Sequence, residues 1–239
     1  MKRFALLPLI SALVLAGSAQ AHQVWLEQDA NSANLYFGEF GENLRETSPG
    51  LLDKFVKPTA HLAGSKGEQA LTLTKSAKSF QLSARAGKNE SLYAEEATYP
   101  VIEQKEGDKV KSRLIWTPAA RLITSSAAVE PKLTLDIVPT GKAGEYKVTY
   151  KGQPLPKAAV TINTQSGWGK EAHADEQGLV HFDTPWQGTY ILETKHTDKT
   201  PGQRDGQAYD TASYVTTLSL NQSTGAKPLP AAPAATPNK

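Results

Sequence analysis

Apolar and polar residues alternate along most of the chain, in short runs separated by turn-forming residues. Residues 133–138 (Leu-Thr-Leu-Asp-Ile-Val) are the clearest case, with an apolar side chain at almost every second position. Alternation is typical of a half-buried strand, whose side chains point to the two faces of a sheet in turn. We predict strands at 23–28, 34–39, 56–63, 70–74, 80–84, 91–94, 113–117, 132–137, 146–150, 159–164, 169–174, 179–183, 189–195 and 213–220. The predicted fold class is all-β.

Proline and glycine interrupt this pattern. Pro118 is predicted to end the strand 113–117, and 119–129 fits either a helix or a loop. Residues 44–55 fit either a short helix or a loop, and the interruption by Ser48-Pro49-Gly50 favours mostly loop. Residues 199–208 are polar, contain two glycines and a proline, and are also predicted to form a loop.

The turn formers at 139–144 mark a predicted domain boundary. We expect two β-sandwich-like domains, an N-terminal β domain at 22–140 and a C-terminal domain at 141–220. The second is expected to be of the immunoglobulin or prealbumin type, because its strands are short and closely spaced. The tail, 221–239, is rich in Pro, Ala, Ser and Lys and has almost no apolar residue besides Leu229. It is predicted to be disordered, because it has too little apolar surface to offset the entropy of ordering.

The first 21 residues have the order of a cleavable secretory signal peptide. Lys2 and Arg3 precede an apolar run at 4–17, and Ala19-Gln20-Ala21 supplies the small residues that signal peptidase recognises. The run is too short to span a bilayer comfortably, and no later segment is long and apolar enough. We therefore expect a periplasmic protein without a membrane span, whose mature chain begins at His22; an uncleaved anchor is the alternative.

Composition limits the chemistry. The chain has no Cys, which excludes thiolate metal sites and Cys nucleophiles, and its one Met is Met1. A metal would need His, Asp, Glu, backbone or terminal-amine ligands. Removing Lys2 and Arg3 leaves 26 − 2 = 24 basic residues against 24 acidic ones. The mature chain thus lacks the basic excess of a nucleic-acid-binding protein.

His22 is the main candidate ligand. After cleavage it would carry a free α-amine and an imidazole, which together form a chelate for late transition metals. His61 and His196, each at the end of a predicted strand, are the candidate partners, although either could be a solvated or structural histidine. Glu27 and Glu39 could orient an imidazole as hydrogen-bonded carboxylates.

His173 and His181 form a separate candidate. A three-residue hairpin loop at 175–179, with Gly178 in the left-handed conformation, would place them opposite each other, close enough to share a metal. A four-residue loop would put them on opposite faces. A solvated outer face is the alternative.

No catalytic motif is present: the sequence has no nucleophile elbow, no His-Glu-x-x-His, no phosphate loop and no EF-hand spacing. A copper oxidase built on an N-terminal histidine brace is the enzymatic alternative, and it needs a second brace histidine.

Two stretches carry a resemblance to a known family. The first begins at His22-Gln23-Val24-Trp25-Leu26-Glu27 and continues through Tyr36–Glu46; the second comprises 152–160, 174–178, 188–192 and 196–198. Together they resemble a family of periplasmic proteins of unknown function that is linked by name to nickel or cobalt uptake. The second stretch alone is similar to collagen-adhesin B-type or prealbumin-like sandwiches. The resemblance implies a metal-associated periplasmic protein and favours His196 as the partner of His22.

We therefore predict a periplasmic protein that binds a transition metal (nickel, cobalt or copper) through His22, His196 and His61. It would supply the ion to a membrane transporter or another envelope partner. The alternatives are a non-enzymatic structural or partner-binding envelope module and the histidine-brace copper oxidase.

Overall fold

The computed structural model describes residues 22–238, so the predicted signal peptide at 1–21 lies outside the described residues. The all-β prediction is confirmed: the described residues contain twenty strands and no α-helix. Two short 3-10 helices occur, η1 (Phe40–Glu42) and η2 (Leu51–Lys54). Within 22–238 no helix has the length and apolar character to cross a bilayer.

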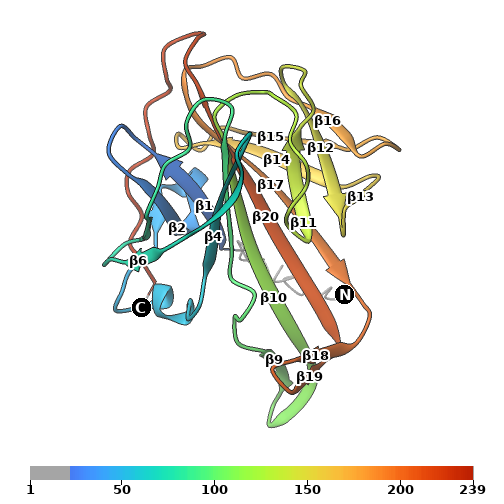
Figure 1. Cartoon of the computed structure of the whole chain (residues 1–239). Helices are drawn as coiled ribbons and strands as arrows, with labels where there is room; N and C mark the ends of the chain where they lie inside the picture. The colour runs from blue at the N-terminus through green and yellow to red at the C-terminus, as the bar shows by residue number, and fades with distance from the viewer. Residues whose placement is uncertain (1–21, 239) are drawn as a thin grey trace, which may run out of the picture.

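A nine-stranded sheet forms the centre of the molecule (Figure 1). In spatial order its strands are β15 (Gly169–His173), β14 (Ala159–Thr164), β17 (Gly188–Asp198), β20 (Thr211–Gln222), β10 (Lys109–Ile123), β8 (Ser91–Glu95), β4 (Thr59–Gly64) and β5 (Gly67–Leu71), with β9 (Ile102–Glu106) paired to the start of β10. The ladder between β10 and β20 is parallel, and the other ladders of this sheet are antiparallel. The two long strands β17 and β20 pair over eleven residues, which is the longest ladder of this sheet.

Smaller sheets cover the two faces of the central sheet. One consists of β1 (Gln23–Gln28), β2 (Ala33–Glu39), β7 (Phe80–Leu82), β6 (Leu73–Lys75) and β3 (Leu44–Arg45). The other consists of β11 (Leu135–Pro139), β12 (Glu145–Tyr150), β13 (Gln153–Pro154) and β16 (Leu179–His181). We call them the β1–β2 sheet and the β11–β12 sheet. Figure 1 shows them on opposite sides of β10 and β20.

Each covering sheet has its own hydrophobic cluster. Leu122 of β10 packs with Val24 and Phe37 against the β1–β2 sheet. Leu192 of β17 packs with Val148 against the β11–β12 sheet. Because side chains alternate along a strand, odd-numbered β17 residues face the β1–β2 sheet and even-numbered ones face the β11–β12 sheet. The arrangement is sandwich-like on both faces, as the sequence predicts.

The predicted boundary near residue 140 matches neither the change of cluster, which falls between Leu122 and Ile123, nor a division between sheets. One cluster uses residues from Val24 to Leu122 and the other uses residues from Ile123 to Leu218. The central sheet, however, takes strands from both sides of the boundary. The division into 22–140 and 141–220 stays a prediction, and its two parts share one continuous sheet.

A buried ion pair joins the central sheet to β11. Arg121 donates from Nε to Asp136 Oδ1 at 2.9 Å and from Nη2 to Oδ2 at 2.5 Å, and both side chains are almost fully buried. The backbone N–H groups of Lys132 and Leu133 also donate to Asp136. Arg121 also donates a hydrogen bond from Nη1 to Ser91 Oγ, so each of its three side-chain nitrogens has a hydrogen-bond partner.

The prediction that Pro118 ends its strand is wrong, because β10 continues to Ile123. The N and C=O of one strand residue point to the same side, and the Pro118 carbonyl accepts from Glu96 N. The missing N–H of Pro118 therefore faces the edge where β9 pairing stops at Leu114 and β8 pairing starts at Ala119. A proline is tolerated there because no ladder hydrogen bond is lost.

Two further segments differ from expectation. The predicted loop 199–208 contains a hairpin of β18 (Gly202–Arg204) and β19 (Gln207–Tyr209), turned by Asp205 and Gly206, both with positive φ. Asp-Gly is a strong signal for a two-residue hairpin turn.

The tail from 223 to 238 is extended and runs past the β1–β2 sheet (Figure 1). Backbone hydrogen bonds join Ala226 to Pro185 and Gln187, and Ala232 to Gln165.

Candidate functional site

His22 stands immediately before β1, with a carboxylate beside each ring nitrogen. Its Nε2 lies 2.6 Å from Oε1 of Glu46, and its Nδ1 lies 3.7 Å from Oε1 of Glu39. The ring packs against Phe37, with centroids 5.0 Å apart. A carboxylate only accepts, so Nε2 carries the proton and donates it to Glu46. Nδ1 is then the nitrogen with a lone pair when the ring is neutral.

A tight return of the chain brings Glu46 to His22. β2 ends at Glu39, η1 turns the chain through Asn43 in the left-handed conformation, and β3 pairs back onto Gly38 and Glu39. Gly38 has φ of 146°, and a Cβ there would clash with the carbonyl oxygen of Leu44. Glu46 N then donates to Phe37 O at 2.8 Å, which fixes the carboxylate under the start of β1.

The end of the tail closes over this carboxylate. Asn238 donates from its backbone N to Oε2 of Glu46 at 3.0 Å and from Nδ2 to Oε1 at 2.6 Å. Glu46 is fully buried. Sequence reasoning missed both Glu46 and Asn238, because a predicted loop and a predicted disordered tail carry no periodic signal that would bring them together.

Negative charge gathers around His22. Burial, and then the nearby Glu42, raise the pKa of Glu39. Burial also raises the pKa of Glu193 on β17, and Glu39 contributes to that rise, while Lys195 lies 3.0 Å away and opposes it. Carboxyl groups that are costly to ionise without a cation make this a favourable position for an added positive charge.

The structure places His196 and His61 away from His22. His196 is an even-numbered β17 residue, so it faces the β11–β12 sheet and its ring packs 4.2 Å from that of Tyr150. Burial lowers its pKa. His22 lies on the opposite side of the central sheet. It is beside Glu39, whose charge raises the pKa of Glu193, an odd-numbered β17 residue that faces the β1–β2 sheet.

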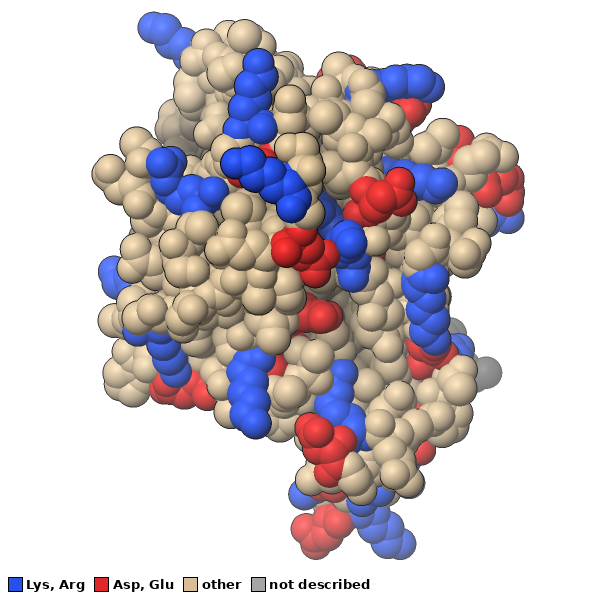
Figure 2. Space-filling view, in the orientation of Figure 1, with Lys and Arg blue, Asp and Glu red and all other residues tan. Residues whose placement is uncertain are grey.

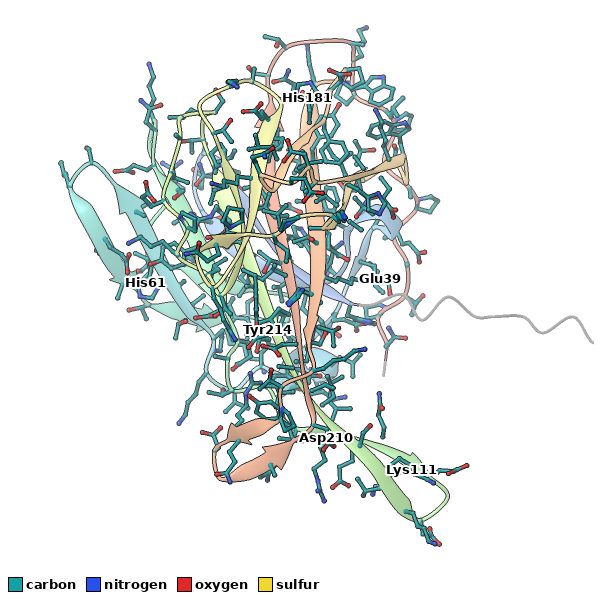
Figure 3. All side chains as sticks on the ribbon, turned by 90° about the vertical axis from the view of Figure 1, so that its right-hand side faces the viewer. Glu39, His61, Lys111, His181, Asp210 and Tyr214 are labelled. Atoms are coloured by element: carbon teal, nitrogen blue, oxygen red, sulfur yellow. The ribbon has the colours of Figure 1, made fainter. Side chains whose placement is uncertain are left out.

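His61 lies on β4, with β20, β10 and β8 between it and the strand of His196. Strands are about 4.8 Å apart, so four steps separate the two histidines by about 19 Å. The His61 ring stacks on Tyr93 at 4.9 Å. Figure 3 shows His61 and Glu39 on opposite sides of the long central strands. Across 22–238, no three His, Asp or Glu side chains are grouped as a ready metal site.

The turn between His173 and His181 has the predicted shape, but the two residues do not pair. Asp175 N donates to Leu179 O at 2.9 Å and Gly178 has φ of 76°. Beyond the turn, β15 joins the central sheet and β16 joins β12, so His173 lies opposite Ala159 and His181 opposite Glu145. Both imidazoles are more than half exposed.

Of the two carboxylates predicted to orient an imidazole, Glu39 lies beside His22 and Glu27 does not. Glu27 Oε1 accepts from Trp25 Nε1 and from Arg45 Nη2, both at 2.7 Å. Away from the site, Lys and Arg alternate with Asp and Glu over the face seen in Figure 2, without a broad patch of one sign.

Comparison with known proteins supplies a family but no activity. No curated protein matches the chain. A family model described as a domain of unknown function, DUF4198, matches residues 19–198, which include β1, the Glu46 turn and the sheets on both faces. The chain therefore belongs to the DUF4198 family.

Proposed function

We propose that the protein binds a divalent transition-metal ion at the amino terminus created by cleavage after Ala21. The observation that carries the proposal is the position of the His22 ring, with Nε2 engaged by the buried Glu46 and Nδ1 turned toward Glu39. This is how a ligating histidine is commonly held, with one nitrogen on an orienting carboxylate and the other facing the metal.

The donors around Nδ1 suit a late transition metal. A free α-amine on His22 and Nδ1 of the same residue would close a six-membered chelate ring. Glu39 Oε1, 3.7 Å from Nδ1, is close enough to supply an oxygen ligand after a small shift. Nitrogen-rich donors favour nickel and copper, with cobalt just below them in the divalent series.

The proposed role is that of a periplasmic accessory protein, with the metal as cargo. The donors of one residue and its neighbours leave part of the coordination sphere to water or to a partner, which suits an ion that is passed on by ligand exchange. The resemblance to proteins linked by name to nickel or cobalt uptake points to a membrane transporter or another envelope protein as the recipient.

The same geometry favours a carrier over the histidine-brace oxidase. A brace needs a second imidazole, and His196 and His61 face other parts of the fold. We therefore propose His22, with Glu39 and Glu46, as the binding residues, and we leave His196 and His61 out of the site.

Calorimetric titration tests the proposal. Nickel, cobalt and copper are titrated into protein that begins at His22 and into protein that retains Ala21. We expect tight binding to the first and at least tenfold weaker binding to the second, because an amide nitrogen replaces the amine. Equal binding by both proteins, or none by either, would remove the amino terminus from the account and leave the partner-binding module as the explanation.

A further inference from the structure

A second site is suggested by a cavity of about 350 Å³ at the other end of β1 from His22. It lies between the β1–β2 sheet and the ends of β10, β17 and β20, and its wall includes Leu26, Tyr36, Leu122 and Ser219. Glu27, also in the wall, is five residues from His22, which is about 17 Å along a strand. The cavity is therefore separate from the proposed metal site, and its volume is within the range of small-molecule pockets.

Ser219 gives this cavity an unsatisfied polar group. The Ser219 side chain is buried, with 1% exposure of the residue, and its hydroxyl has no hydrogen-bond partner within residues 22–238. Ser219 pairs with Ile191, which faces the β1–β2 sheet, so its side chain points to the face where the cavity lies. A buried hydroxyl without a partner destabilises the folded chain, and a bound ligand that hydrogen-bonds to it removes that cost.

Other groups on the wall are also placed to bond a ligand. Glu27 uses Oε1 for Trp25 and Arg45, so its second oxygen can accept. Burial, and then Glu27, raise the pKa of Tyr36, which keeps its hydroxyl protonated as a donor at neutral pH. Thr189 adds a hydroxyl from the strand opposite Asn221.

The mixture of donors and acceptors indicates the class of ligand. The hydroxyls of a ligand both donate and accept, which matches Ser219, Thr189 and Tyr36. The apolar residues Leu122 and Leu220 in the wall suit the C–H face of a sugar ring. Arg45 already neutralises Glu27, which weakens the case for an organic cation. An anion would meet Glu27 and Asp29 on a wall that has no Lys or Arg. We propose that this cavity binds a small neutral polyhydroxylated molecule, of the size of a monosaccharide.

The test uses saturation-transfer NMR on the full mature protein with glucose, galactose and N-acetylglucosamine as probes, and putrescine as the cationic control. Ser219→Ala removes the buried hydroxyl, and Thr149→Val is its matched control. Thr149 has the other buried hydroxyl without a partner in 22–238, on β12 away from this cavity.

We expect at least one sugar to bind the native protein and the Thr149→Val variant, and to bind Ser219→Ala about tenfold more weakly. Ser219→Ala should unfold at the same or a higher denaturant concentration, so a misfolded variant would be recognised. Absence of sugar binding, sugar binding that Ser219→Ala leaves unchanged, or binding of putrescine alone would each overturn the proposal. Metal titration of Ser219→Ala should match the native protein, which keeps this test independent of the metal site.

Discussion

The His22 ring and the Glu46 carboxylate are held together at 2.6 Å, although twenty-four residues separate them in the chain. The contact exists because Gly38 lets β3 fold back closely on β2, and because Asn238 closes over the carboxylate from the tail. Glu46 thereby sets both the orientation and the proton position of the imidazole. It is the residue through which the amino terminus, the β2–β3 turn and the tail meet.

Glu46→Gln should weaken metal binding by about ten- to a hundredfold, because a neutral amide holds the Nε2 proton less firmly and lowers the basicity of Nδ1. The measurement is competition titration of nickel with the processed protein. Glu171→Gln is a suitable control, since Glu171 also neighbours a histidine, His173, but is exposed. Unchanged affinity in Glu46→Gln would mean that the carboxylate has only a structural role.

Ending the chain at Ser223 should lower the free energy of unfolding by about 1–3 kcal/mol, because the hydrogen bonds of Ala226, Ala232 and Asn238 are lost and part of their contribution is offset by the entropy that the tail regains. Urea unfolding measures the difference. A midpoint equal to that of the full chain would show that the tail is free in solution, as its composition alone predicts.

Asp136→Asn should destabilise the protein by about 3–5 kcal/mol, because it leaves the Arg121 charge buried without its partner. Chemical denaturation gives the value. The surface pair Lys111–Glu106 supplies the control, since both side chains are more than half exposed and Glu106→Gln should cost about 0–1 kcal/mol. Similar values for the two variants would show that the Arg121 pair does not join the layers as described.

Stability should fall on acidification through a contribution from His196. Burial lowers the pKa of the folded imidazole below its unfolded value of about 6.5, so the unfolded chain takes up the proton first. The stabilising contribution is complete above the unfolded pKa and is lost as the pH falls below it. His196→Phe should flatten this part of the curve of stability against pH, while His173→Gln, at an exposed position, should leave it unchanged. The opposite result would contradict the burial of His196.

Alternation of apolar residues was enough to predict most of the strands. β1 is predicted with its observed ends, Gln23 and Gln28, because the expected mature start at His22 bounds it on one side and the turn formers Asp29, Asn31 and Ser32 bound it on the other. The errors have local causes. Pro118 is tolerated because its side of β10 has no strand partner at that point, which depends on where β9 and β8 end and not on the sequence near Pro118.

The candidate site was only partly predictable. The sequence singles out His22 and Glu39, which the structure brings together. It cannot show that His196 faces the other side of the central sheet, because that depends on which sheet covers each face. Glu46 ends the stretch that carries the family resemblance, but nothing in the sequence brings it to His22, because its position depends on the close approach of β3 to Gly38.

The most direct test is a crystal structure of the protein that begins at His22, grown with nickel and measured at the nickel absorption edge. We predict an anomalous peak bonded to Nδ1 and the α-amine of His22, with Glu46 still on Nε2. A nickel peak at His61, His196 or the pair His173 and His181, with none at His22, would contradict it.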